Sequence, residues 1–250
     1  MLGFLIRQDL RQRFSGNVLG TAWAVLSPLL QLAVFALVFA QIFKARVPGL
    51  DERGYVMFLA LGMWPWLAFS EGIARGMTAL TDQAGLLNKV AVSAWNVVAA
   101  RVFAAFIVHG VGFLVVVPVL WLWQGTLALA YWPLTLAAWA GMLALALALA
   151  QILAICHIFA RDTQTIAGYF LTAWMFLTPI LYDSSLLPEW LRAVMAFNPM
   201  AGLIAGIRDP LLWKNMAAAW PWPSLLMALV ALGLAALMAR RFRGHVREFL

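Results

Sequence analysis

The chain has 250 residues, of which 65% are hydrophobic and 11% are charged, and its net charge is +7. Soluble domains carry about 25% charged residues, so this composition excludes an ordinary soluble domain. The long apolar blocks indicate an all-α integral membrane protein. A net positive charge can indicate nucleic-acid binding, but in a membrane protein basic residues gather on the cytoplasmic side of the membrane. We therefore expect no nucleic-acid partner.

Residues 1–17 predict a basic amphipathic helix that lies on the inner membrane surface. Apolar residues recur every four positions, and arginines take the other faces. The apolar set is Ile6, Leu10 and Phe14, and the basic set is Arg7, Arg11 and Arg13. Such a helix buries one face among membrane lipids and keeps its charges at the headgroups. The alternative is a positively charged flank of the first span.

Six segments are long and apolar enough to be read as transmembrane helices of one domain, residues 1–250. The expected spans are residues 19–43, 54–70, 102–123, 133–160, 165–182 and 215–239. The second helix is expected to continue through Glu71 and Arg75, which stand four apart and can pair on one face near the membrane edge. Residues 81–95, which follow, are less hydrophobic and form an expected cytoplasmic segment.

Residues 183–214 interrupt the pattern with pieces too short to cross a bilayer. Residues 193–207 are apolar, but Asn198-Pro199 stands in their middle. Proline removes a backbone donor and disfavours helical geometry in the residue before it. We therefore expect a pair of short re-entrant helices on the outer side rather than another span.

The distribution of basic residues supports six spans with both termini in the cytoplasm. With six spans, eleven of the 17 Lys and Arg residues fall inside, whereas a seventh span would move the Arg-rich tail outside, against the positive-inside rule. The eleven are Arg7, Arg11, Arg13, Arg75, Lys89, Arg101, Arg161, Arg240, Arg241, Arg243 and Arg247.

Three pairs of glycines stand four residues apart, a spacing that lets helices approach closely. They occur at residues 16 and 20, 72 and 76, and 202 and 206. Ordinary packing within the chain and a dimer face both explain this spacing.

The sequence gives no sign of an active site. His109 stands alone in the third span, no His, Cys, Asp and Glu set has metal-ligand spacing, and no nucleophile elbow is present. The chain also lacks a P-loop, so it cannot bind ATP in that way. We expect no catalytic residue, metal or cofactor on this chain; if transport is active, ATP and magnesium belong to a separate ATPase subunit.

Four stretches in order along the chain carry a family resemblance. They are LIRQDLRQRFSGNVLGTAWAVLSPLLQL, LLNKVAVSAWNVVAARV, FARDTQTIAGYFLTAWMFLTPILY and PEWLRAVMAFNPM. Together they resemble the membrane-spanning subunits of bacterial ABC exporters for O-antigen, capsule and teichoic acid, the type-2 ABC permeases. The matching residues are Leu19, Gly20, Trp23, Pro28, Arg161, Asp162, Thr178, Pro179, Ile180, Tyr182, Pro188, Asn198 and Pro199. The chain departs from the family at Val92-Ser93, where a Phe-Pro-like pair is usual, and this affects the register of the ATPase contact.

The resemblance implies a homodimer with two copies of a P-loop ATPase, located in the bacterial inner membrane. It implies that a polysaccharide on a polyprenyl diphosphate lipid passes between the two permeases. Short helices within residues 183–214 would then gate the outer side. The residues implied in ATPase coupling are Arg7, Arg11, Arg13, Asn88, Lys89, Arg161 and Asp162.

Aromatic side chains are the candidates for the polysaccharide path, because sugar rings stack on aromatic faces. The path and gate set is Trp64, Trp66, Phe69, Tyr169, Trp174, Tyr182, Trp190, Asn198 and Pro199. For each aromatic residue the alternative is a lipid-interface anchor or core packing.

The function that the sequence favours is export of an undecaprenyl-linked polysaccharide, with O-antigen as the expected cargo. The alternatives are a drug or small-lipid exporter of the same fold, a membrane enzyme of lipid-linked sugar metabolism, and a membrane scaffold without transport activity.

Overall fold

A computed structural model describes residues 1–13, 20–44, 47–89, 92–124, 129–213 and 221–241. Its helices are α1 (Leu2–Arg13), α2 (Trp23–Phe35), α3 (Glu52–Asp82), α4 (Ala84–Lys89), α5 (Ala94–Gln124), α6 (Trp132–Phe159), α7 (Thr163–Leu177), α8 (Glu189–Met195), α9 (Pro199–Trp213) and α10 (Trp222–Arg241). A π-helical segment, Ala36–Ile42, extends α2. These described residues contain no β-strand, so the predicted all-α class is confirmed.

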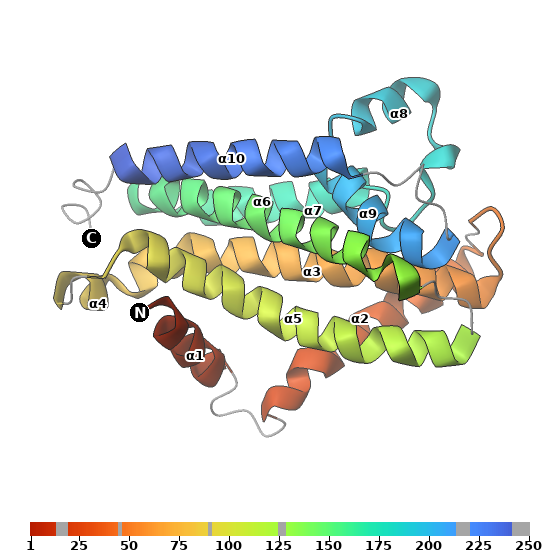
Figure 1. Ribbon diagram of the computed structural model, residues 1–250, viewed down its shortest axis with the longest axis horizontal. Helices are drawn as coiled ribbons and strands as arrows, with labels where there is room; N and C mark the ends of the chain where they lie inside the picture. Colours follow the sequence, from red (N-terminus) through yellow and green to blue (C-terminus); the bar gives the residue numbers. More distant parts are fainter. Residues whose placement is uncertain (14–19, 45–46, 90–91, 125–128, 214–220, 242–250) are drawn as a thin grey trace.

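The long helices run roughly parallel to one another along the longest axis of the molecule (Figure 1). One end of the bundle holds α1, α4 and the last turn of α10, and we call it the α4 end. The opposite end holds α8 and α9, and we call it the α8 end (Figure 1).

Helix α3 is the central element. In its most apolar stretch 78% of the residues are buried, against 17% for both α2 with its extension and α10. Its start is fixed by Asp51, whose side chain accepts a hydrogen bond from the Gly54 backbone N–H at 2.8 Å, as in a helix N-cap. Helices α5, α6 and α9 pack around α3, while α2 and α10 leave most of their apolar surface outward.

Within the described residues a helix lies in each of the six predicted spans, but α3 and α5, with 31 residues each, are longer than predicted and α7 is shorter. Five helices are long and apolar enough to cross a membrane, and the bent α8–α9 pair would make six if it counted as one span. The predicted fifth span, residues 165–182, is α7 with only 15 residues, because the helix stops before Thr178-Pro179. Fifteen residues of helix span about 22 Å, less than the roughly 30 Å hydrocarbon core. The chain is a multi-pass membrane protein.

The predicted break at Asn198-Pro199 is present. Helices α8 and α9 meet there at an angle of 89°. Helix α9 buries one face against α3, α6 and α10, whereas α8 has no buried residue and projects from the bundle (Figure 1). The segment 183–214 therefore begins with an exposed helix and continues with an embedded one.

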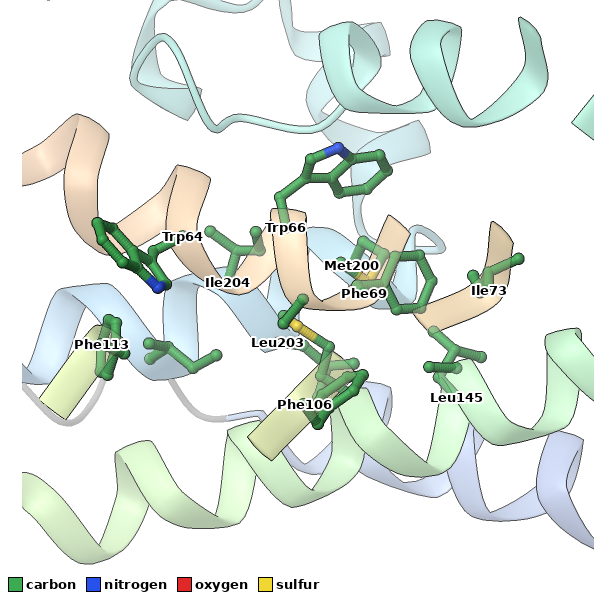
Figure 2. Packing of buried hydrophobic residues seen from close by; sticks show 14 of the residues in the cluster. Trp64, Trp66, Phe69, Ile73, Phe106, Phe113, Leu145, Met200, Leu203 and Ile204 are labelled. Carbon is green, nitrogen blue, oxygen red and sulfur yellow. The ribbon is translucent and has the colours of Figure 1, made fainter. Parts of the chain in front are cut away.

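The hydrophobic core joins the middle of α3 to its neighbours. Trp64, Phe69 and Ile73 of α3 are fully buried, and Figure 2 shows them beside Phe106 of α5 and Leu203 of α9. This core fixes α3 relative to α9, so the α8 end and the centre of the bundle are packed as one body.

Glycines in this core mark close contacts between helices. A Cβ atom at Gly76 would lie 2.8 Å from the Ala150 Cβ and 2.9 Å from the Val102 Cγ2, and one at Gly202 would collide with Ser224. The packing explanation is therefore confirmed for the pairs at residues 72 and 76 and at residues 202 and 206, whereas a Cβ at Gly20 meets nothing within 4 Å. Gly16 lies outside the described residues.

We expect Gly76→Val to destabilise the fold, because the added side chain overpacks the junction of α3, α5 and α6. Overpacking of this kind costs about 1–3 kcal/mol. The measurement is the thermal unfolding midpoint of the purified protein in detergent. Gly110→Val is the matched control, since a Cβ at Gly110 meets nothing within 4 Å. Equal midpoints for the two variants would contradict the close-packing assignment.

Candidate functional site

A buried carboxylate fastens α1 to the bundle at the α4 end. Asp9 is 4% exposed. Its Oδ1 and Oδ2 accept hydrogen bonds from Arg75 Nη2 of α3 at 2.9 and 2.7 Å, and Arg101 Nε of α5 lies 3.0 Å from Oδ1. Two arginines from two different helices thus hold one aspartate. We call these three residues the Asp9 clamp.

A second ionic group lies deeper along α3, around Glu71. Arg13 at the end of α1 forms a bidentate pair with it, Nη1 to Oε1 at 2.7 Å and Nη2 to Oε2 at 2.8 Å. His109 Nε2 lies 2.8 Å from Glu71 Oε2, and because a carboxylate only accepts, that nitrogen carries the proton. The predicted Glu71–Arg75 pair is present at 3.8 Å, the longest of these contacts.

Sequence reasoning found only one of these contacts. His109 is not alone as expected, because the register of α3 and α5 brings it to Glu71 across 38 residues of sequence. The contacts of Asp9 were not predicted from the sequence. An acidic residue among arginines on an amphipathic helix was the available signal.

A large cavity lies beside this ionic group. Its volume is 780 Å³, and α2, α3 and α7 form its walls. Hydroxyl, amide and ionic side chains share the lining with apolar ones; the polar members are Arg13, Ser27, Gln31, Ser70, Glu71, His109 and Thr172. Side chains of this kind both donate and accept hydrogen bonds, so the cavity suits a ligand rich in hydroxyl groups. We call it the polar cavity.

The predicted coupling residues all belong to the α4 end. Arg7 and Arg11 are exposed on α1, and Arg161 and Asp162 are exposed in the turn between α6 and α7. Arg13 instead points inward to Glu71. Asn88 and Lys89 end helix α4, which occupies part of the predicted segment 81–95, and their side chains lie outside the described ones.

The predicted aromatic path residues separate into two groups. Trp64, Trp66 and Phe69 are at most 3% exposed and belong to the core, where Trp174 meets the rings of Trp66 and Phe69 edge-on. They are therefore out of reach of a ligand on the surface of this protomer. The others reach the surface: Tyr169 is 77% and Trp190 is 69% exposed, and Trp174 and Tyr182 are partly exposed.

Asn198 joins the α8–α9 corner to the end of α7. Its Oδ1 accepts hydrogen bonds from Trp174 Nε1 at 2.9 Å and from the Met200 backbone N–H at 3.0 Å. Its Nδ2 donates to Thr178 Oγ1 at 3.1 Å. Pro199 starts α9, the position that a missing backbone N–H suits best. We call Asn198, Trp174 and Thr178 the corner cluster.

A buried arginine supports the same region from α9. Arg208 is 4% exposed, its Nη1 donates to the Pro179 carbonyl at 2.8 Å, and its guanidinium lies 3.8 Å from the centre of the Phe58 ring. Its Nε also donates to Asp209 at 2.8 Å. The irregular segment after α7 is thereby held against α3 and α9, a role that the sequence did not reveal.

Comparison with known proteins assigns the fold to a family. The ABC-2 type transporter family matches residues 2–212. The O-antigen export system permease protein RfbA of Myxococcus xanthus is 31% identical over 252 residues, covering 98% of this chain and 92% of that protein. An RfbA protein of Klebsiella pneumoniae is 24% identical, covering 97% and 93%. The polysialic acid transport protein KpsM of Escherichia coli is 20% identical, covering 82% and 78%.

Proposed function

This chain belongs to the ABC-2 type transporter family. We propose that it is the membrane-spanning subunit of an exporter of undecaprenyl-linked polysaccharide, with O-antigen as its cargo. The observation that carries the proposal is its 31% identity, over nearly the full length of both chains, to an O-antigen export permease. The bacterial inner membrane is the proposed location, with both termini in the cytoplasm.

The energy for export is proposed to come from two copies of a separate P-loop ATPase, docked on a dimer of this chain. The α4 end offers the exposed charges of α1 and of the α6–α7 turn on one side of the molecule. A partner seated there reaches α1, which is tied to α3 and α5 through the Asp9 clamp. Movement of α1 would thus be passed to two long helices.

The polar cavity is proposed as part of the glycan path. Its hydroxyl and amide groups offer exchangeable hydrogen bonds, so a sugar chain can slide without a fixed register. Tyr169 lies three residues from Thr172 on α7, and residues three apart share a helix face, so its exposed ring adds a stacking surface beside the cavity. At the α8 end, the exposed helix α8 with Trp190 is the proposed outer gate.

Deletion of the gene tests the function directly. Lipid-linked glycan should accumulate inside the cell and surface glycan should disappear, with both restored by the intact gene. Normal surface glycan in the deletion strain would refute the polysaccharide assignment. Loss of resistance to small hydrophobic compounds with unchanged glycan would indicate the drug exporter instead.

Filling the polar cavity tests the path. Gly168 of α7 lines the cavity, and a Cβ there meets nothing within 4 Å, so Gly168→Trp adds a large side chain without an internal clash. We expect most surface glycan to be lost while the protein still accumulates in the membrane. Gly233→Trp on α10 is the matched control, because Gly233 also has open space around it and lies away from the cavity. Equal export by the two variants would remove the cavity from the path.

A further inference from the structure

A second cavity lies at the α4 end, on the side of the bundle covered by α10. Its volume is 290 Å³, and it opens between the ends of four helices. Its lining includes Leu80 of α3, Trp95 of α5, Gln151 and Ile155 of α6, and Ala236 and Arg240 of α10. None of them belongs to the polar cavity or to the Asp9 clamp. We call this cavity the α10 crevice.

The inner part of the α10 crevice is apolar and fixed in shape. Leu80 is 1% exposed and Ile155 is 6% exposed. Gln151 is 2% exposed, and its Nε2 donates to the Trp95 carbonyl at 3.1 Å, which fastens the start of α5 to α6. Because that amide nitrogen already has a partner, the depth of the crevice mainly offers aliphatic surface. An aliphatic chain suits this space better than a sugar or a nucleotide.

The rim of the α10 crevice is basic. Arg240 lines the crevice, Arg241 follows it in the last turn of α10, and both are exposed. Neither has an acidic partner within the part of the chain that the structure describes. Trp95, which is half-buried and lines the same crevice as Arg240, is of the type that gathers at the headgroup level of a bilayer. A ligand for this rim therefore carries negative charge.

The outer face of α10 places the crevice next to lipid. Leu226, Val230, Leu234 and Leu237 repeat every three or four residues and are all more than half exposed, so they form one apolar stripe. A stripe of this kind on a transmembrane helix faces hydrocarbon. The same helix ends in the two arginines. The apolar stripe therefore lies at the depth of the acyl chains, and the arginines lie at the depth of the headgroups of the leaflet at the α4 end.

We propose that the α10 crevice binds one anionic phospholipid of the membrane leaflet at the α4 end. Its phosphate pairs with Arg240 and Arg241, and one acyl chain enters between Ala236, Leu80 and Ile155. Basic pockets between transmembrane helices recognise anionic headgroups in this way. A zwitterionic lipid fits the apolar part equally well but gains less from the rim, so the site selects by charge. The proposal does not depend on the transported cargo.

The test uses the purified full chain in detergent, titrated with phosphatidylglycerol or with phosphatidylcholine of the same acyl chains. Binding is read by native mass spectrometry and by the shift of the thermal unfolding midpoint. Phosphatidylglycerol should bind more tightly than phosphatidylcholine. Arg240→Gln and Arg241→Gln should each weaken its binding about fivefold, as expected for about 1 kcal/mol per basic residue at a membrane surface.

Two further variants separate a built site from general surface charge. Ala236→Phe fills the crevice without changing its charge, and it should weaken the binding of both lipids. Arg161→Gln removes an exposed arginine of the same end that does not line the crevice, and it should leave phosphatidylglycerol binding unchanged. Equal binding of the two lipids, or equal weakening by Arg161→Gln and Arg240→Gln, would overturn the proposal. Lipid binding that is unchanged in the Ala236→Phe variant would also overturn the proposal.

Discussion

Asp9→Asn should lower the free energy of unfolding by about 2–4 kcal/mol and release α1 from the bundle. The change removes the carboxylate charge that Arg75 and Arg101 share, and leaves them only their longer contacts, Arg75 to Glu71 at 3.8 Å and Arg101 to Asp82 at 3.5 Å. Removing one partner of a fully buried ion pair costs about 3–5 kcal/mol. The cost here is smaller, because the two arginine side chains keep 26% and 15% exposure and can recruit water. The thermal unfolding midpoint in detergent measures the effect.

Asp162→Asn is the matched control for this prediction. It removes the same charge from an exposed turn at the same end of the molecule, and surface substitutions of this kind stay within about 0.5 kcal/mol. A double-mutant cycle between Asp9→Asn and Arg101→Met should show a coupling energy, since the two residues share one contact. If Asp9→Asn proves as mild as Asp162→Asn, the clamp does not hold α1.

The two variants also separate folding from coupling. If α1 passes movement of the proposed ATPase to α3 and α5, then Asp9→Asn should reduce glycan export even where enough protein remains in the membrane. Asp162→Asn should affect export only if its turn contacts the ATPase. Export per molecule of protein in the membrane distinguishes these cases.

Much of the fold could be predicted because a bilayer imposes simple rules on sequence. Uncharged stretches of 20 or more residues marked α2, α5, α6 and α10, and the Asn198-Pro199 pair marked a break that the structure confirms. The expected fifth span, residues 165–182, extends five residues beyond the end of α7. The helix ends before Thr178-Pro179, where a proline is expected to end or bend it, and the apolar residues that follow form an irregular segment held by Arg208.

The candidate sites were harder to predict, because their contacts cross large distances in sequence. The Asp9–Arg75 and Glu71–His109 contacts depend on the relative register of helices, which composition and spacing do not determine. Aromatic residues show the same limit. Trp64 and Tyr169 are equally suitable for stacking on a sugar, yet one is fully buried and the other is 77% exposed. Residue type gives the chemistry, and only packing decides which side chains are accessible.

Asn198→Ala should loosen the α8–α9 corner from the end of α7. The variant loses the acceptor for Trp174 Nε1 and the Met200 backbone N–H, and the donor to Thr178. Three hydrogen bonds at about 1 kcal/mol each suggest a cost of about 3 kcal/mol. This energy corresponds to roughly a hundredfold larger population of the open corner.

Cysteine labelling can measure this opening, in a background where Cys156, the only cysteine, is replaced by alanine. Met200 is 0% exposed, so Met200→Cys should react slowly with a thiol reagent and much faster when Asn198→Ala is added. Trp190→Cys, at a position 69% exposed on α8, should react quickly in both backgrounds and controls for the reagent. Asn198→Asp retains the acceptor oxygen and should fall between the two. Unchanged labelling of Met200→Cys upon Asn198→Ala would show that Asn198 does not hold the corner closed, and fast labelling before that change would contradict the closed corner itself.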